Sequence, residues 1–243
     1  MKPVGYMFNR KEGLEGERGL FYDYIAASNG LFIEAENKLV EARIPIADCE
    51  IRGLAPLKPK FALTFGSIPQ RFFDLALDMF LTDTTQEHYV AVTGRNGYDF
   101  YVPPQEKEGD KVVYECGAHV ALDLHSHGTM GAWFSKKDNE DDTGLRVSGV
   151  VGSLDKTPVV KLRLGVYGYF LPLSWKEVFD GALVGAAEYE EKEVIGEDEL
   201  HCDAAGGWWQ PEDRGGGMRG YGWLRGRGAL PDLGQQRPGP APY

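Results

Sequence analysis

Residues 112–128 read VVYECGAHVALDLHSHG, and this stretch decides the fold because a long apolar strand runs directly into two histidines. β-Branched and aromatic residues are frequent in it, which predicts one strand over residues 112–124. Side chains at positions i and i+2 of a strand point to the same face, so His125 and His127 would present both imidazoles to one point. The stretch therefore predicts a strand that ends in a pair of potential metal ligands.

A short helical segment is expected after the two histidines. Ser135 and Asp138 are three positions apart, a spacing that places both residues on one helix face. His125, His127 and Asp138 together form a set of three nitrogen and oxygen ligands, the form that catalytic zinc sites take when the fourth position is left for water. Zinc lowers the pKa of bound water toward about 7 and polarises carbonyl groups, so this set could support the hydrolysis of an amide.

The sequence upstream predicts a helix and a hairpin. Ser67 and Gln70 have the spacing of a capping box, and apolar residues at helical spacing predict a helix over residues 69–81. The elements expected after it are a strand over 87–94, a tight turn at Asn96-Gly97, a strand over 98–102, further strands over 146–152, 159–166 and 167–171, and a short helix over 174–179. This interleaving predicts an α/β fold in the form of an α+β sandwich.

Composition divides the chain into four segments. Residues 1–60 form a small strand-rich part, in which Pro45, Pro56 and Pro59 favour edge strands. Residues 61–186 carry the helix, the strands and the candidate ligands. An acidic segment over 187–202 follows, and then residues 203–243, whose 41 positions include 11 glycines and 5 prolines. That composition predicts a disordered tail.

The charge balance limits the possible partners. Thirty-seven acidic residues against 26 basic ones give a formal net charge of -11, which argues against binding to bulk nucleic acid or to an anionic membrane. Cys49, Cys116 and Cys202 are odd in number and far apart, which favours free thiols in a reducing compartment. With neither a signal segment nor a long apolar run in view, the expected location is the cytoplasm.

The pattern His125-x-His127-x(7)-Ser135-x(2)-Asp138 is similar, residue for residue, to the motif of the JAMM (MPN-plus, Mov34/JAB) zinc metalloprotease family, in its prokaryotic JAB branch. The resemblance covers residues 65 to about 180. It implies a mixed β-sheet flanked by helices, with one zinc ion per chain held by His125, His127 and Asp138. It also implies that Ser135 donates a hydrogen bond to the oxyanion of the tetrahedral intermediate.

The family also carries a glutamate on the strand after the first helix, and Glu87 matches it in context and spacing. The resemblance implies that Glu87 takes a proton from the zinc-bound water and later delivers one to the leaving amine. Glu34, Glu36 and Glu115 are the rival positions. The first two lie outside the helix–strand unit, and Glu115 lies in the middle of the expected strand.

One residue departs from the family pattern. The position after the second histidine is commonly proline, and here it is Gly128. Glycine surrenders more backbone entropy on ordering, so Gly128 and Gly131 would loosen the loop that leads to the ligand helix. We expect an effect on the rate of reaction and not on metal binding.

Several neighbours of the motif are expected to have ordinary structural roles. Trp133 and Phe134 would pack the ligand helix as core residues. Asp142 would be a solvated loop residue, and His88 an ordinary strand histidine with satisfied hydrogen bonds.

The N-terminal part contains residues 29–32 (NGLF) and 44–46 (IPI) ahead of the metalloprotease unit, an arrangement similar to the protein A family of the bacterial PRTRC cassette. This resemblance implies a ubiquitin-like protein as substrate and an E1-like, ThiF-related partner. The expected function is a zinc-dependent peptidase or isopeptidase that cleaves an amide bond at the C-terminus of a ubiquitin-like protein. A non-catalytic MPN-type scaffold and a small-molecule zinc hydrolase remain as alternatives.

Overall fold

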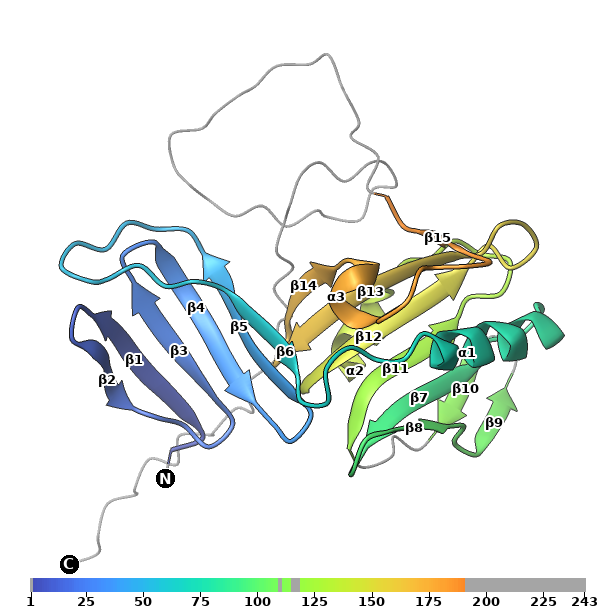
Figure 1. The fold of residues 1–243 in the computed structure, drawn as a ribbon, viewed down its shortest axis with the longest axis horizontal. Coiled ribbons are helices and arrows are strands. Elements are labelled where there is room, and N and C mark those ends of the chain that lie inside the picture. Colours follow the sequence, from blue (N-terminus) through green and yellow to red (C-terminus); the bar gives the residue numbers. More distant parts are fainter. Residues whose placement is uncertain (1, 109–110, 115–118, 191–243) are drawn as a thin grey trace, which may run out of the picture.

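The computed structural model describes residues 2–108, 111–114 and 119–190, whose strands form two large sheets side by side (Figure 1). The first sheet has six strands in the order β2-β1-β3-β4-β5-β6. They are β1 (Val4–Arg10), β2 (Gly13–Glu17), β3 (Tyr22–Ala27), β4 (Gly30–Glu36), β5 (Val40–Ala47) and β6 (Lys60–Leu63).

The second sheet has seven strands, of which six follow the order β14-β13-β12-β11-β7-β8 while β15 pairs with β13 outside that path. They are β7 (Tyr89–Gly94), β8 (Tyr98–Tyr101), β11 (Val120–Ser126), β12 (Leu145–Gly152), β13 (Val159–Val166), β14 (Tyr169–Leu173) and β15 (Ala187–Glu188). A separate antiparallel pair joins β9 (Gln105–Glu108) and β10 (Lys111–Tyr114). The helices of the described residues are α1 (Arg71–Thr82), α2 (Lys136–Asp141) and α3 (Trp175–Val178).

Both large sheets are mixed, because each contains parallel as well as antiparallel pairs. β1 runs parallel to β3 in the first sheet, and β11 runs parallel to β12 in the second. The predicted α/β class is confirmed, although strands far outweigh helices in the described residues.

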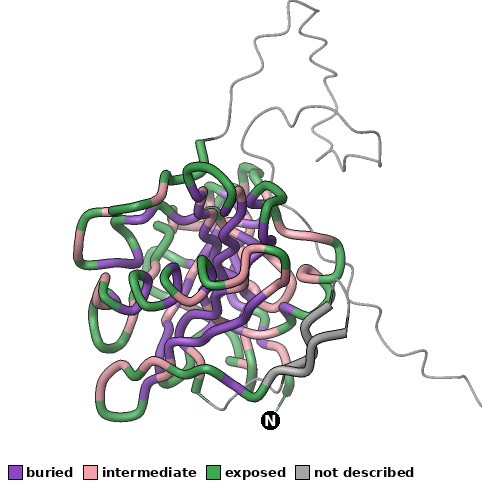
Figure 2. Tube along the Cα trace, turned by 90° about the vertical axis from the view of Figure 1, so that its right-hand side faces the viewer, coloured by how far each residue is buried: buried purple, intermediate pink, exposed green. Residues whose placement is uncertain are grey.

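The strands of the second sheet separate an apolar face from a polar one. Leu122 and Leu124 of β11 belong to the main apolar cluster, which also takes in the buried residues of α1 and α3. Asp123 and His125 alternate with them and therefore point to the opposite face. Figure 2 shows the buried segments gathered in the middle of the molecule, with exposed loops around them. The apolar face fixes the sheet in place, and the polar face is left for the candidate ligands.

The first sheet shares this core with the second. Ile44 of β5 lies in the same cluster as the apolar residues of β12 and β13. Two hydrogen bonds also connect the sheets: the Asn37 side chain donates to the carbonyl oxygen of Leu145 at 2.8 Å, and the hydroxyls of Tyr24 and Tyr169 lie 3.2 Å apart. The strand-rich N-terminal part is thus packed against the strands that carry the candidate site.

The expectation that proline confines the N-terminal strands to edges is wrong for β5. This strand has β4 on one side and β6 on the other, but β6 pairs only with Val40–Arg43 and ends before Pro45 is reached. No described strand lies beside Pro45 on the β6 side, so the N–H group that proline lacks costs the sheet no hydrogen bond there. The segment boundary predicted between residues 60 and 61 falls inside β6.

Helix α1 forms close to where it was predicted, but Ser67 does not cap it. The N-cap residue is Gln70, which makes no capping hydrogen bond through its own side chain. The backbone N–H of Gln70 instead donates to Oδ1 of Asp180 at 2.9 Å, and Ile68 forms a β-bridge with Phe179. The cap is supplied from 110 residues further along the chain, a distance that no local pattern reveals.

The single strand predicted over residues 112–124 is also wrong. Its first part is β10, which pairs with β9 in a separate hairpin, and its second part is β11 in the large sheet. His119, immediately before β11, has a positive φ of 66°, so the backbone turns sharply there.

Some predictions fall outside the described residues. These are the disorder of residues 203–243, the acidic segment beyond residue 190, and the states of Cys116 and Cys202. Cys49 is exposed and forms no disulfide, as predicted. No helix in the described part of the chain is long and apolar enough to cross a membrane.

Candidate metal centre

The candidate ligands come from the end of β11 and from the first turn of α2. His125 lies in β11, between β7 and β12, and His127 follows the end of the strand. The backbone N–H of His127 donates to the carbonyl oxygen of Val151 at 2.8 Å, which extends the contact with β12 beyond the strand. Both histidines are therefore held by backbone pairing in the interior of the sheet.

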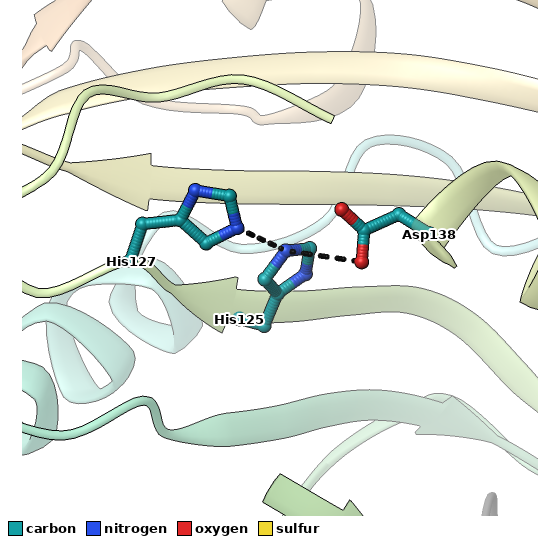
Figure 3. Close-up of side chains that lie close together, drawn as sticks. All are labelled: His125, His127 and Asp138. Carbon is teal, nitrogen blue, oxygen red and sulfur yellow. Dashed lines mark hydrogen bonds and ion pairs between the residues drawn. The ribbon is translucent and has the colours of Figure 1, made fainter. Parts of the chain in front are cut away.

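His125, His127 and Asp138 converge on one point (Figure 3). The two Nε2 atoms of the histidines lie 3.2 Å apart, and Nε2 of His125 lies 3.7 Å from Oδ1 of Asp138. Two ligand atoms that bind a tetrahedral zinc ion at about 2.0–2.1 Å are about 3.3 Å from each other. These two separations are close to that value and all three ligand atoms lie within 4.8 Å of one another, so this group could bind a metal ion.

Burial keeps both imidazoles in the form that binds metals. It lowers the pKa of His125 to about 4, against the opposing effect of the Asp138 carboxylate. Burial also lowers the pKa of His127, again opposed by Asp138. Since a metal ligand must be unprotonated, both residues can act as ligands at neutral pH.

A reciprocal capping box orients Asp138. The Ser135 hydroxyl accepts a hydrogen bond from the backbone N–H of Asp138 at 3.1 Å, and Oδ2 of Asp138 accepts one from the backbone N–H of Ser135 at 2.6 Å. One carboxylate oxygen is therefore engaged by the cap, while Oδ1 faces His125. The predicted spacing of Ser135 and Asp138 has two effects: it starts α2, and it aims the carboxylate.

The side chain of Arg163, on β13, contacts the first turn of α2. Its side chain is only 5% exposed, and its guanidinium lies between two rings, 3.8 Å from the centre of Phe134 and 3.9 Å from the centre of Phe170. It donates to the carbonyl oxygen of Asp138 at 3.3 Å and to the side chain of Asn139. The planar fork of arginine thus connects a central strand to the residue that carries the third ligand.

A network of buried carboxylates and guanidiniums adjoins the site. Oδ2 of Asp142 lies 3.3 Å from the Arg163 guanidinium, and Asp142 is only 2% exposed, so the expectation of a solvated Asp142 is wrong. Nε of Arg146 lies 2.9 Å from a carboxylate oxygen of Asp123. Burial raises the pKa of Asp123 to about 6, although the Arg146 guanidinium acts in the opposite direction. A β-carbon at Gly165 would lie 2.6–2.9 Å from the carboxylate of Asp142, so glycine provides the space for this network.

Gly128 has a definite conformation in the loop after His127. Its φ of 55° is left-handed, and a β-carbon there would lie 2.5 Å from the carbonyl oxygen of Thr84. Its own carbonyl oxygen accepts a hydrogen bond from the backbone N–H of Leu154 at 2.9 Å. Glycine therefore permits a close approach at this position, which is a different role from the loosening that the sequence suggested.

Glu87 lies next to His127 in the backbone register. The backbone N–H of Ser126 donates to the carbonyl oxygen of His88 at 2.9 Å. One further step along these antiparallel segments sets Glu87 opposite His127, and residues in opposite positions share a face. Glu87 is half-buried and is not part of the three-ligand group. This position is compatible with a base beside the metal ligands.

The rival glutamates are placed differently. Glu34 is engaged in the first sheet by Arg43 and by Arg18, whose Nη1 lies 2.9 Å from Oε1 of Glu34. Glu36 is exposed at the end of β4, and Glu115 lies outside the described residues.

The aromatic residues of the loop divide into an exposed one and a partly covered one. Trp133 is 48% exposed, so its predicted core role is wrong; its ring centre lies 5.1 Å from that of His127. Phe134 is partly buried and packs on the Arg163 guanidinium, as expected for a residue that supports the ligand helix. His88 is buried and its ring bonds to the carbonyl oxygen of Asp83 at 3.0 Å, which confirms its ordinary structural role.

Sequence reasoning missed Arg163 and Asp142 as supports of the site. A signal was present for Arg163, because it is an isolated inward cation in the strand Val159–Val166, whose other buried residues are apolar or glycine. A charge in such a position indicates a buried partner. Asp142 gave no comparable signal, since it follows a short helix whose six residues are all charged or polar.

Comparison with protein-family models finds no match to this chain, and a search of curated proteins also finds none. The functional argument therefore rests on the residues of the site themselves.

Replacement of Gly128 by proline, the residue common in the similar family, should destabilise this protein. Proline fixes φ near -65°, whereas the loop requires 55° and a close approach to Thr84. We expect the free energy of unfolding to fall by about 1–3 kcal/mol in denaturant titrations. Gly131→Ala is the matched control, because the nearest atom to a β-carbon there is 4.0 Å away. A Gly128→Pro protein as stable as the wild type would contradict the requirement for a left-handed residue.

Arg163→Lys should weaken metal binding while it retains the buried positive charge. Lysine can still neutralise Asp142, but it lacks the fork that reaches both Asp138 and Asn139. We expect zinc affinity, measured by competition with a chromophoric chelator, to fall about 10–100-fold. Arg71→Lys is the control, because Arg71 also lies over an aromatic ring, 5.1 Å from the centre of Phe72, but its own side chain is exposed and lies away from the site. Equal affinities in both variants would show that Arg163 does not position the ligand.

Proposed function

We propose that this protein is a zinc-dependent peptidase or isopeptidase of the JAMM (MPN-plus) type, which cleaves an amide bond at the C-terminus of a ubiquitin-like protein. The single observation that carries the proposal is the convergence of His125, His127 and Asp138, whose ligand atoms all lie within 4.8 Å of one another. Two further features support the proposal: Ser135 begins the helix that carries Asp138, and the Ser126–His88 backbone hydrogen bond, extended by one step, sets Glu87 opposite His127. We accordingly propose that the second sheet with α1 and α2 is an MPN-type sandwich.

The chemistry of the ligands favours zinc. Two imidazole nitrogens and one carboxylate oxygen are the set of an open catalytic zinc site, and hard cations such as magnesium and calcium prefer oxygen ligands alone. We therefore propose one zinc ion per chain, held by His125, His127 and Asp138. When bound, zinc supplies Lewis acidity toward a carbonyl oxygen and lowers the pKa of water toward about 7.

Two further residues of the chain would handle the proton and the developing charge. Glu87 is half-buried beside His127, so it is placed to accept a proton from water and to return one to the leaving amine. The Ser135 oxygen accepts from the backbone N–H of Asp138, which leaves the hydroxyl proton free to be donated to the oxyanion of a substrate.

The surroundings of the group are compatible with an extended peptide as substrate. Trp133 is 48% exposed with its ring centre 5.1 Å from that of His127, and Met130 is 50% exposed with its backbone N–H bonded to the carbonyl oxygen of His127, so the two residues offer an apolar rim. A flexible C-terminus of a ubiquitin-like protein can reach such a rim, whereas a folded surface would be held away from a half-buried glutamate. The resemblance to the PRTRC protein A family adds an E1-like, ThiF-related protein as a second proposed partner.

The first test of the proposal is the zinc content of the purified chain, since it requires no known substrate. We expect about one zinc ion per chain in the wild type and its loss in His127→Ala and Asp138→Ala, measured by mass spectrometry of the metal. His119→Ala is the control, because His119 is exposed and lies before the other end of β11. If the wild-type protein failed to bind added zinc, the proposal of a zinc enzyme would be rejected, and a non-catalytic scaffold of the same fold would be favoured.

Glu87→Gln should abolish cleavage while zinc stays bound. Glutamine keeps the size of the side chain but cannot accept the proton, so we expect kcat to fall by about 100-fold or more. The assay is the release of a reporter fused to the C-terminus of a ubiquitin-like protein, with zinc content measured on the same samples. Glu36→Gln is the matched control, since Glu36 is exposed on the first sheet. Full activity of Glu87→Gln with zinc in place would show that another group is the base.

A further inference from the structure

A hollow lies near the end of the second sheet opposite to the candidate metal centre. We propose that this hollow, here named the basic pocket, binds a small phosphate ester whose organic part is a flat ring, such as a nucleoside phosphate. Its volume is about 420 Å³, within the range of small-molecule sites. It is lined by Lys38, Leu39, Phe65, Gly94, Arg95 and His119.

Three nitrogen-bearing side chains converge on the basic pocket from separate segments. Lys38 comes from the turn between β4 and β5, Arg95 from the turn between β7 and β8, and His119 from the residue before β11. None of the three side chains forms an ion pair with a carboxylate in the described residues. In a chain with a net charge of -11, the two cations Lys38 and Arg95 favour an anion that brings the opposite charge, and the imidazole of His119 can add a hydrogen bond.

The backbone around the basic pocket is shaped to hold these groups. His119 has a left-handed φ of 66°, an uncommon conformation for a residue other than glycine, and its carbonyl oxygen accepts from the backbone N–H of Gly94 at 3.0 Å. The pairing of β7 with β11 shifts its register between Val120 and Leu122, directly after His119. Register shifts of this kind re-aim side chains and are frequent near binding sites. These backbone features hold His119 at the edge of the pocket that it lines.

The floor of the basic pocket is apolar and depends on a glycine. A β-carbon at Gly94 would lie 2.7 Å from Leu39 and 3.0 Å from the ring of Phe65, so only glycine lets both side chains close over the strand. Phe65 is 40% exposed, and Tyr98 holds its ring edge-on at 5.6 Å while the Tyr98 hydroxyl donates to the carbonyl oxygen of Gly66 at 2.7 Å.

A fixed, partly exposed aromatic ring beside positive charges fits a ligand with two parts. The charges would bind the phosphate groups, and the ring of Phe65 would contact the flat organic part. Neither inorganic phosphate nor an uncharged nucleoside would use both features. This combination is the reason for the choice of a ring-bearing phosphate ester over a simple anion.

The basic pocket is separate from the metal centre. His119 and His125 are six residues apart along β11, which corresponds to about 20 Å in an extended strand. A ligand in the pocket therefore does not touch the catalytic group, and this inference does not depend on the proposed peptidase activity.

The experiment is a calorimetric titration of the full chain with adenosine diphosphate at physiological salt. A chelator is present and magnesium is absent, so that binding through the metal centre is excluded. Pyrophosphate and adenosine are titrated in parallel. We expect saturable binding of adenosine diphosphate at one site per chain, at least tenfold weaker binding of pyrophosphate, and none of adenosine.

Variants locate the site. Arg95→Ala and Lys38→Ala should each weaken the binding of adenosine diphosphate at least fivefold, whereas Arg52→Ala and Lys58→Ala, which remove exposed cations elsewhere, should not. Phe65→Leu should weaken adenosine diphosphate but leave pyrophosphate unchanged. Thermal melts of all variants check that each protein is folded.

Any of four results would overturn the inference. The first is no saturable binding of adenosine diphosphate at millimolar concentration. The second is binding that persists unchanged in both Arg95→Ala and Lys38→Ala, which would place the ligand elsewhere. If pyrophosphate binds as tightly as adenosine diphosphate, the ring-bearing ligand is rejected. It is also rejected if the Phe65→Leu variant binds adenosine diphosphate as tightly as the wild type does.

Discussion

The alternation of side chains along β11 is the constraint on which the rest of the structure depends. Leu122 and Leu124 enter the main apolar cluster, and the alternating residues Asp123 and His125 are thereby committed to the other face. A slip of one position would bury the histidine in the apolar cluster and expose the leucines. The burial of two leucines is worth about 3–6 kcal/mol, which exceeds what such a slip could recover. The core thus determines where the candidate metal ligands point.

The second half of the metal centre is held in a different way, because α2 has almost no core of its own. The helix has six residues, none of them buried, and helices of this length are marginal by themselves. Polar contacts hold it in position. Ser135 and Asp138 form the capping box at its start, and the guanidinium of Arg163 donates to the carbonyl oxygen of Asp138. The placement of the third ligand therefore depends on hydrogen bonds and on two aromatic rings, and only indirectly on apolar packing.

Local patterns in the sequence predicted those features that local interactions create. The histidine pair, the spacing of Ser135 and Asp138 and the hairpin at Asn96-Gly97 each follow from a few neighbouring residues, and the structure brings the three candidate ligands together. The features that were missed involve partners far apart in the chain. The carboxylate that caps α1 comes from Asp180, and Arg163 reaches the carbonyl of Asp138 across 25 positions.

Local reasoning also failed where one apolar run serves two elements. Residues 112–114 and 120–124 are rich in strand-forming types, and Gly117 between them was the one local sign that the run serves two strands, β10 in a hairpin and β11 in the large sheet. Gly128 is a related case: its type suggested a loose loop, whereas the close approach to Thr84 that requires it becomes visible only in three dimensions.

The buried network of charged side chains next to the site determines the net charge around the candidate ligands. Two carboxylates, Asp123 and Asp142, are matched by two guanidiniums, Arg146 and Arg163, so the buried network carries little net charge. Because both imidazoles stay neutral, Asp138 is the one anionic group among the three ligands. A divalent cation held by this set would keep one net positive charge, whereas additional carboxylate ligands would cancel it. The matched pairs lie on the same face of the sheet as His125, so they leave the charge at the candidate ligands to Asp138 alone.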